Sequence, residues 1–385
     1  ISMVRADIID AIDRILRVYS HNLREPFGGK QLLLVGDVFQ LEPVVKNDER
    51  EILNRFYPTP YFFSARVFGQ IDLVSIELQK VYRQTDPVFV GVLDHIRTNT
   101  AGAADLQLLN TRYGSQIEES EADMYITLAT RRDTVDSINE KKLAELPGES
   151  ITFEGVIEGD FPESSLPTSQ ELVLKPGAQI IFIKNDFDRR WVNGTIGVIA
   201  GIDEEEETIY VITDDGKECD VKRDSWRNIR YRYNEKTKEI EEEVLGSFTQ
   251  YPIRLAWAIT VHKSQGLTFS RVVIDFTGGV FAGGQAYVAL SRCTSLDGIQ
   301  LKKPINRADI FVRPEIVNFA GRFNNRQAID KALKQAQADV QYAAAARAFN
   351  KGDMEECLEQ FFRAIHSRYD IEKPVPRRLI RRKLG

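Results

Sequence analysis

The stretch from Tyr251 to Phe269 constrains the fold more than any other part of the chain. Its first part, Arg254 to Val261, is mostly apolar and partly β-branched, which predicts a buried strand. Thr260, near the end of that strand, is placed to cap a following helix whose amino terminus would attract phosphate. The sequence then turns polar at once, through His262, Lys263, Ser264, Gln265 and Gly266. Donor-rich residues at the carboxyl end of a buried parallel strand lie where α/β sheets bind ligands.

Taken alone, this stretch is explained equally well by a strand that ends in a solvated turn. Two further stretches give it a context, because Gly36–Val44 reads Gly-Asp-Val-Phe-Gln-Leu-Glu-Pro-Val and Tyr287–Arg292 reads Tyr-Val-Ala-Leu-Ser-Arg. In chain order, the three stretches resemble motifs III, V and VI of superfamily 1 DNA helicases. The branch that they resemble is the RecD-like, petite-integration-frequency type, and the resemblance covers residues 1–315.

This resemblance implies an α/β protein built from RecA-like P-loop NTPase motor domains, the first of them truncated. It predicts four parts, in the order partial first motor domain, second motor domain, inserted SH3-like β-barrel and helical carboxyl-terminal extension. Their residues are 1–115, then 116–165 with 250–315, then 166–249, and 316–385. Short strand-like runs at close spacing between Ser150 and Glu243 independently favour a small barrel.

The composition is typical of a soluble globular protein, with 43% hydrophobic residues, 28% charged residues and a net charge of −6. This net charge does not favour nucleic-acid binding by the whole chain, but a local basic track remains compatible with it. Three cysteines, Cys219, Cys293 and Cys357, show no metal or disulfide spacing. Asp203–Glu207 and the basic segment Pro374–Gly385 are interpreted as solvated surfaces. We find no membrane-length apolar run and no leader, and we expect a cytoplasmic protein without a membrane partner.

The sequence contains no Gly-x-x-x-x-Gly-Lys-Ser/Thr loop of the kind that cradles ATP phosphates. The resemblance places that loop, and the Asp-Glu pair that holds magnesium, upstream of residue 1. It therefore implies the carboxyl-terminal portion of a helicase that uses ATP and Mg²⁺, with no metal ligand among these residues. We expect this chain alone to lack ATPase activity.

Three side chains are expected to sense or stabilise the γ-phosphate. The run Gln31–Val35 predicts a buried parallel strand, and the loop after it carries Asp37 and Gln40. By resemblance Gln40 senses the γ-phosphate while Asp37 supports the loop; the alternative is a turn that Asp37 caps locally. Arg83 by resemblance reaches the γ-phosphate from between the motor domains, and the alternative is a surface salt bridge.

Arg292 follows the predicted helix Gln285–Ser291 and by resemblance acts as an arginine finger, with a structural ion pair as the alternative. The resemblance also assigns the polar residues after the central strand. Thr260 and His262 would touch DNA, and Lys263 and Ser264 complete the predicted DNA-binding set. Ser264, Gln265 and Gly266 would couple DNA contact to the nucleotide. The predicted nucleotide-binding set is Asp37, Gln40, Arg83, Gln265, Gly266 and Arg292.

Two segments carry open alternatives. The segment Leu128–Asn139 is similar to the family's Thr-Asn-x-x-Val-Asp-x-Ile-Asn pattern, but Arg131 and Arg132 stand where a threonine and an asparagine are more usual. A DNA role for this loop therefore does not follow from the resemblance. In Trp226–Tyr233, aromatic residues alternate with arginines, which suits either stacking of a single strand or an ordinary half-buried strand.

The segment Ala328–Ser367 is strongly helical and resembles one tetratricopeptide repeat, although a helical hairpin that packs on the motor or docks a protein partner explains it as well. The resemblance as a whole implies part of an ATP-dependent DNA helicase that moves 5′ to 3′ on single-stranded DNA and unwinds duplex at single-strand junctions. The alternative is a non-catalytic nucleic-acid-binding or scaffold protein that recruits partners through its helical tail.

Overall fold

The computed structural model describes residues 1–115, 124–234 and 239–368. The chain forms two compact units. Unit 1 comprises residues 1–3, 36–43 and 81–313, and unit 2 comprises residues 4–35, 44–80 and 314–385. Within the described ranges, no helix is both long and apolar enough to span a membrane.

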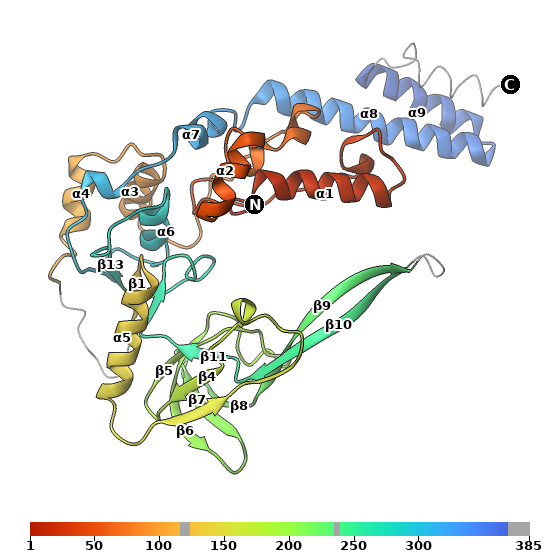
Figure 1. The fold of residues 1–385 in the computed structure, drawn as a ribbon. Helices are drawn as coiled ribbons and strands as arrows, with labels where there is room; N and C mark the ends of the chain where they lie inside the picture. Colours follow the sequence, from red (N-terminus) through yellow and green to blue (C-terminus); the bar gives the residue numbers. More distant parts are fainter. Residues whose placement is uncertain (116–123, 235–238, 369–385) are drawn as a thin grey trace. The chain divides into compact units, whose positions relative to one another are not determined.

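A four-stranded parallel sheet forms the centre of unit 1 (Figure 1). Its strands, in spatial order, are β12 (Ala258–Thr260), β1 (Ile126–Ala129), β13 (Val272–Asp275) and β14 (Ile299–Leu301). Every residue of β1 and β13 is buried, and both strands are therefore mostly apolar without an alternating pattern. The single strand predicted over Arg254–Val261 is confirmed only at its end by β12, because Arg254 and Leu255 belong to a separate strand, Ile253–Leu255, that pairs in a different sheet.

Four helices of unit 1 accompany this sheet. They are α3 (Pro87–Arg97), α4 (Ala103–Asn110), α5 (Arg132–Glu145) and α6 (Gln285–Ser291). Phe89 and Ile96 of α3 and Val288 of α6 share one apolar core with the sheet residues Leu128 and Ile274. Asn139 of α5 binds the backbone of Ala258 through both of its amide atoms, at 3.0 and 2.9 Å, which fixes α5 against β12.

The antiparallel strands of unit 1 enclose a second core. A five-stranded sheet has the order β11 (Ile253–Leu255), β5 (Gln179–Phe182), β6 (Ile196–Asp203), β7 (Thr208–Thr213) and β8 (Glu218–Val221). A separate pair joins β2 (Ile151–Glu154) to β4 (Glu171–Leu174). Phe153 and Leu174 of this pair bury against Phe182, Trp191 and Tyr251, so both sheets share one interior, as a small barrel requires. Strand β2 lies before residue 166, where the sequence placed the start of the insertion.

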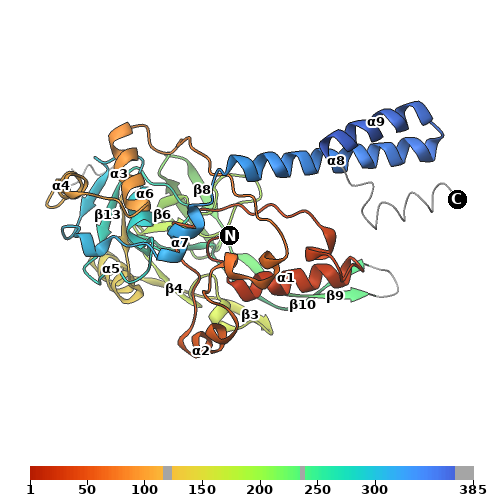
Figure 2. The same ribbon diagram turned by 90° about the horizontal axis from the view of Figure 1, so that it is seen from above.

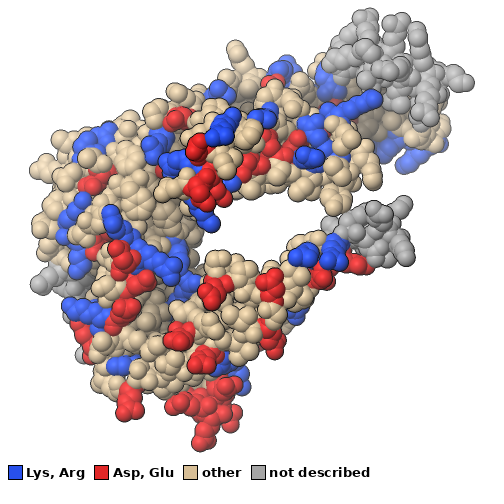
Figure 3. All heavy atoms as spheres, viewed as in Figure 1, with Lys and Arg blue, Asp and Glu red and all other residues tan. Residues whose placement is uncertain are grey.

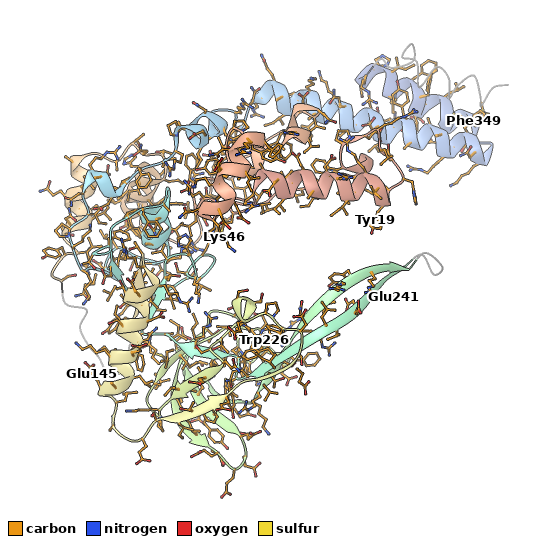
Figure 4. All side chains as sticks on the ribbon, in the orientation of Figure 1. Tyr19, Lys46, Glu145, Trp226, Glu241 and Phe349 are labelled. Carbon is orange, nitrogen blue, oxygen red and sulfur yellow. The ribbon has the colours of Figure 1, made fainter. Side chains whose placement is uncertain are left out.

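Strands β9 (Asp224–Asn234) and β10 (Glu239–Gln250) form a long hairpin, and β3 (Val156–Gly159) pairs with β10. Figure 4 marks Trp226 near the base of the hairpin and Glu241 towards its far end. Directly paired residues share a face of an antiparallel ladder. Tyr231 lies opposite Glu242, whereas Arg230 lies opposite Glu243 on the other face.

Along β9, Trp226 shares a face with Arg230 and Arg232, and Arg227 shares the other face with Ile229 and Tyr231, so each face carries a ring together with an arginine. Arg232 also forms an ion pair with Glu243 at 2.8 Å. This arrangement is compatible with both an ordinary strand and a stacking surface. The side chain of Tyr233 lies outside the described residues.

Unit 2 is helical in its described part. It contains α1 (Ala6–Tyr19), α2 (Asn47–Phe56), α7 (Pro314–Ala320), α8 (Arg326–Lys351) and α9 (Met354–Ser367). Short 3₁₀ turns lie at Pro26–Gly29, Phe62–Ser64 and Arg66–Gly69. Two further 3₁₀ turns, Glu163–Ser165 and Arg307–Asp309, belong to unit 1.

The strand predicted at Gln31–Val35 is wrong, because this segment forms no ladder, and the apolar-rich segment Leu73–Leu78 forms none either. Leu33 is 87% exposed and Leu78 is 90% exposed. A strand needs a neighbour for its backbone hydrogen bonds, and the described part of unit 2 supplies none.

Aromatic residues join the two ends of unit 2. Phe63 stacks on Phe319 of α7 with ring centroids 4.4 Å apart, and Phe62 meets the same ring edge-on at 5.6 Å. Beyond α7, helices α8 and α9 lie side by side as a hairpin that turns at Gly352, where φ is +82° (Figures 1 and 2). The predicted helical segment Ala328–Ser367 is confirmed, and the basic segment Pro374–Gly385 lies outside the described residues.

Candidate functional site

The loop of residues 36–41 in unit 1, named here the sensor loop, is organised by Asp37. The Asp37 carboxylate accepts a hydrogen bond from the backbone N–H of Phe39 at 3.1 Å. Tyr287 of α6 donates its hydroxyl to the same carboxylate at 3.2 Å, and Arg97 of α3 forms an ion pair with it at 3.5 Å. Asp37 thus caps its own turn and also binds two helices.

The helical residues Tyr287 and Arg97 are both suited to binding the Asp37 carboxylate. Burial and the neighbouring Asp37 raise the pKa of Tyr287, so its phenol keeps the proton that it donates. The Arg97 guanidinium lies 4.4 Å from the centre of the Phe39 ring, which adds a cation–π contact to the ion pair.

Gln40 and Gln265 connect the sensor loop to the turn after β12. The Gln265 amide nitrogen donates to the Gln40 amide oxygen at 3.0 Å. The amide nitrogen of Gln40 points to Asp37 at 3.4 Å, a weak hydrogen bond. The amide oxygen of Gln265 is buried and has no hydrogen-bond partner among the described residues. An unsatisfied buried acceptor marks a place where a donor is needed.

Gly284 allows α6 to begin directly against the sensor loop. Its φ is +76°, and a Cβ there would lie 2.3 Å from the carbonyl oxygen of Phe39 and 2.5 Å from that of Gln40. Both the left-handed backbone and the close approach require glycine.

Arg83 lies beside the end of α6. Its Nε donates to the Thr268 hydroxyl at 2.9 Å and its Nη1 donates to the Ser291 carbonyl at 3.2 Å. The neighbouring Gln84 is buried and donates to the carbonyls of Ser291 and Cys293 at 3.1 and 2.8 Å. Among the described residues no carboxylate pairs with Arg83, so the surface salt bridge considered from the sequence does not form.

Arg292 is 1% exposed. Its guanidinium donates to the carbonyls of Val288 and Leu267 at 3.0 and 3.2 Å and to the Ser291 hydroxyl at 3.0 Å. No carboxylate lies within ion-pair distance of it in the described part of the chain. Burial, followed by repulsion from Arg83, lowers the pKa of Arg292 to about 10. The structure therefore contains a buried arginine without the ion pair that the structural alternative requires.

The polar residues after β12 form a turn. Thr260 accepts the backbone N–H of Lys263 on its hydroxyl at 3.3 Å, and Ser264 donates its hydroxyl to the Val261 carbonyl at 2.8 Å. Gly266 closes the turn with φ of +87°. The expectation that Thr260 caps a helix is therefore wrong, because the chain leaves the helical region within one turn. Ser264 is fully buried and its hydroxyl serves the turn itself.

His262 and Lys263 lie within this turn. The His262 ring lies nearly parallel to that of Phe281, with centroids 6.4 Å apart, and burial lowers the pKa of His262. Burial, followed by repulsion from Arg254 and Arg132, lowers the pKa of Lys263 to about 8. A cation beside two others is poised to accept an anion.

Sequence reasoning missed several contributors to this site: Arg97, Gln84, Thr268 and Gly284. The glycine pair Gly283-Gly284 carried a signal of backbone freedom, and Gln84 adjoins a predicted residue. Arg97 carried none, because its pairing with Asp37 arises only from the tertiary fold. Within the described residues, no group of three or more His, Cys, Asp or Glu side chains is arranged to hold a metal ion.

A model of the PIF1-like helicase family matches residues 1–91. The chain is 34% identical to the human ATP-dependent DNA helicase PIF1 over 307 residues, which cover 78% of this chain and 45% of the human protein. It is 32% identical to the ATP-dependent DNA helicase Pif1 of Campylobacter jejuni, covering 78% of this chain and 67% of that protein. The structure of the Bacteroides Pif1 helicase in complex with ADP-AlF3 and single-stranded DNA matches with a TM-score of 0.66 and 40% identity, over 83% of this chain and 73% of that one. The chain spans about half the length of the first curated relatives that it matches.

Proposed function

The chain belongs to the PIF1-like helicase family, and on this premise we propose that it forms part of an ATP-dependent DNA helicase. The protein moves 5′ to 3′ on single-stranded DNA, unwinds duplex at single-strand junctions, and uses ATP with Mg²⁺. Supporting this proposal, the human and Campylobacter relatives are named ATP-dependent DNA helicases, and the Bacteroides relative binds ADP-AlF3 and single-stranded DNA.

The nucleotide side of the proposal uses Gln40, Arg83 and Arg292, with Asp37 as support. ATP supplies the phosphoryl group and the free energy. Arg292 uses three of the five N–H donors of its guanidinium, which leaves two for phosphate oxygens. Arg83 engages Nε and Nη1, so Nη2 remains for an anion. These cations lack carboxylate partners among the described residues, so the donor set fits a triphosphate terminus.

The DNA side uses the residues that surround the turn after β12. We assign Thr260, His262 and Lys263 to contact with the DNA backbone or bases, while the buried Ser264 shapes the turn that presents them. Gln265 and Gly266 then transmit that contact towards the nucleotide.

One observation carries the proposal: the 3.0 Å hydrogen bond from Gln265 to Gln40. It joins the turn that would contact DNA to the residue that would sense the γ-phosphate. If Gln265 or Gln40 moves, this hydrogen bond either breaks or displaces the other residue. Such a bond is the physical link that a DNA-stimulated motor needs.

The direct test is binding of the full chain to a fluorescent single-stranded oligonucleotide, followed by anisotropy at low and high salt. We expect binding that weakens with salt, because phosphate contacts release counterions. His262→Ala should weaken it, whereas the matched control His366→Ala, on α9, should not. Failure of the unchanged chain to bind at low salt would refute the assignment of the DNA side.

A further inference from the structure

Helix α9 carries a row of exposed apolar side chains, named here the α9 stripe: Met354, Leu358 and Phe362. Because these residues are four positions apart, they lie on one face of the helix. Met354 and Leu358 are each 49% exposed, and Phe362 is 58% exposed. Phe362 also borders a hollow of about 630 Å³ that residues of α8 and α9 line together. The hairpin therefore presents an apolar face that is open to an additional segment.

Contacts with α8 fix α9 and the point at which the chain leaves it. Phe361, beside the stripe, meets Tyr342 of α8 with ring centroids 6.1 Å apart, and Ala364 is fully buried. At the end of α9, Arg368 forms an ion pair with Asp339 of α8 at 2.5 Å. The Arg368 carbonyl also accepts the Tyr342 hydroxyl at 3.0 Å. The chain therefore continues from a defined point on the hairpin.

The two helices of the hairpin differ in charge. Helix α8 contains five basic and two acidic residues, whereas α9 contains one basic and three acidic residues. Figure 3 shows Lys and Arg side chains along the face of the α8 region that it presents. Glu355 and Glu359 each directly follow a stripe residue, so they border the stripe. Of the two, Glu359 pairs with Arg363, and Glu355 has no ion pair in the described part of the chain. A segment that is both apolar and basic would therefore complement α9 better than α8.

The chain itself supplies such a segment beyond the described residues. Residues 374–385 contain five basic residues and no acidic one, and Leu379, Ile380 and Leu384 recur among them at helical spacing. The residues between Arg368 and Leu379 can span at most about 33–36 Å. Phe362 lies about 9 Å back along the helix from Arg368, since an α-helix rises about 1.5 Å per residue. Leu379 can therefore reach the α9 stripe.

The short connection favours this segment over a separate molecule as the occupant of the stripe. A short linker keeps its end at an effective concentration on the order of millimolar. A second copy of the chain in a micromolar solution would compete at a disadvantage of about a thousandfold. The occupant that the observations favour is thus part of the same chain.

We propose that the segment Pro374–Gly385 docks on the α9 stripe of its own chain. Its leucine and isoleucine side chains cover the three stripe residues, and its basic side chains lie near Glu355 and Glu359. Docking removes apolar surface from water and places cations beside carboxylates, so it has both an apolar contribution and a salt-sensitive one. The inference is independent of the proposed function, because it uses neither the nucleotide residues nor the turn after β12.

The test is photo-cross-linking of the full chain with benzoylphenylalanine in place of Leu379, followed by mass spectrometry of the cross-linked peptides. We expect the main product to join this position to the α9 peptide that contains residues 354–362, within one chain. Leu358→Ser should lower the yield of this product about fivefold, because it removes an apolar contact. Glu355→Lys should lower the yield about two- to threefold at low salt and less at high salt.

Leu333→Ser is the matched control, because Leu333 is also an exposed helical leucine but belongs to α8. It should leave the cross-linking yield unchanged. Leu358 and Leu333 are both exposed, so neither substitution removes a core contact of the hairpin. Circular dichroism of each variant checks that its helix content is unchanged.

Cross-links scattered over the chain, or a yield that Leu358→Ser does not change, would overturn the inference. A product that joins two chains, with none formed within one chain, would assign the stripe to a second copy and would also overturn it. Cross-linking to an added single-stranded oligonucleotide, with no product on α9 in its absence, would make the segment a nucleic-acid contact and refute the docking. Failure of the chain to bind an oligonucleotide would refute the DNA side of the proposed function alone and leave this docking standing.

Discussion

Gly284→Ala tests whether α6 holds the sensor loop in place. The added Cβ would lie 2.3 and 2.5 Å from two backbone oxygens, and such contacts essentially never fall below 3.0 Å. The loop and the helix must therefore separate by about 0.7 Å. No rotamer change relieves the clash, because both neighbouring atoms belong to the backbone. We expect the displaced loop to weaken the Gln265–Gln40 hydrogen bond, whose acceptor lies on that loop.

The expected cost has two parts. Alanine in the left-handed region costs about 1–2 kcal/mol, and forcing packed groups apart costs about 1–3 kcal/mol more. Gly284→Ala should therefore lower the free energy of unfolding by about 2–5 kcal/mol. Gly279→Ala is the matched control, because Gly279 has φ of +78° and a Cβ added there would have no neighbouring atom within 4 Å. It should show the first part alone.

Urea unfolding followed by tryptophan fluorescence measures the difference in free energy of unfolding between the two variants, and it reports on unit 1. All three tryptophans, Trp191, Trp226 and Trp257, lie in unit 1. The signal therefore reports the unit that contains both glycines. Equal losses in Gly284→Ala and Gly279→Ala would refute the close approach of α6 to the sensor loop, since strain alone would then account for both.

Three further predictions concern the chemistry of the site. In a double-mutant cycle, Gln40→Ala and Gln265→Ala should each destabilise unit 1, with a coupling energy of about 1 kcal/mol; additive effects in urea unfolding would contradict their hydrogen bond. Because the pKa of Lys263 is about 8, oligonucleotide affinity should fall as pH rises from 7 to 9 and Lys263→Arg should flatten that profile; an unchanged profile in the arginine variant would count against Lys263. The 385-residue chain should show no DNA-stimulated phosphate release, since it contains no phosphate-cradling loop; release that disappears in Arg292→Ala would disprove this.

The stability effect of Lys263 has the opposite sign to its binding effect. Its pKa is lower in the folded chain than the ordinary value of 10.5, so the unfolded state binds more protons between pH 8 and 10.5. Folding stability from this group therefore rises across that window. As pH rises, oligonucleotide affinity should therefore fall while the free energy of unfolding rises, so measuring both across one pH series distinguishes the two effects of Lys263.

Strands buried on both faces were the easiest elements to predict. The end of Arg254–Val261 is mostly apolar, and it forms strand β12 with a partner on the parallel sheet. Gln31–Val35 carries the same signal but forms no ladder, because hydrogen-bond partners are not encoded within the run itself. Apolar character predicts burial against a neighbour, and the neighbour is a property of the rest of the fold.

The residues of the site likewise fall into those that could be recognised from the sequence and those whose contacts depend on the rest of the fold. Motif residues such as Asp37, Gln40 and Gln265 were recognisable in the sequence, and in the structure Gln40 lies within hydrogen-bond distance of both Asp37 and Gln265. Their functional roles remain predictions. The contacts of Arg97 were not recognisable, because an arginine near the end of a helix reads as a solvated residue until the loop that it supports is in place. Thr260 was misread for a related reason: its capping hydroxyl is compatible with a turn or a helix, and Gly266 decides between them.

Arg292 shows how stability and the proposed chemistry oppose each other at one residue. Lowering its pKa from 12.5 to about 10 corresponds to about 3 kcal/mol of cost in keeping the buried guanidinium charged. Its three hydrogen bonds go to neutral oxygens, and its charged neighbour Arg83 repels it. A carboxylate partner would remove much of that cost, but it would also occupy the donors that a phosphate needs and cancel the charge that attracts it. The absence of a described counter-ion at Arg292 is therefore what an anion-receiving role requires, and a purely structural role would leave it unexplained.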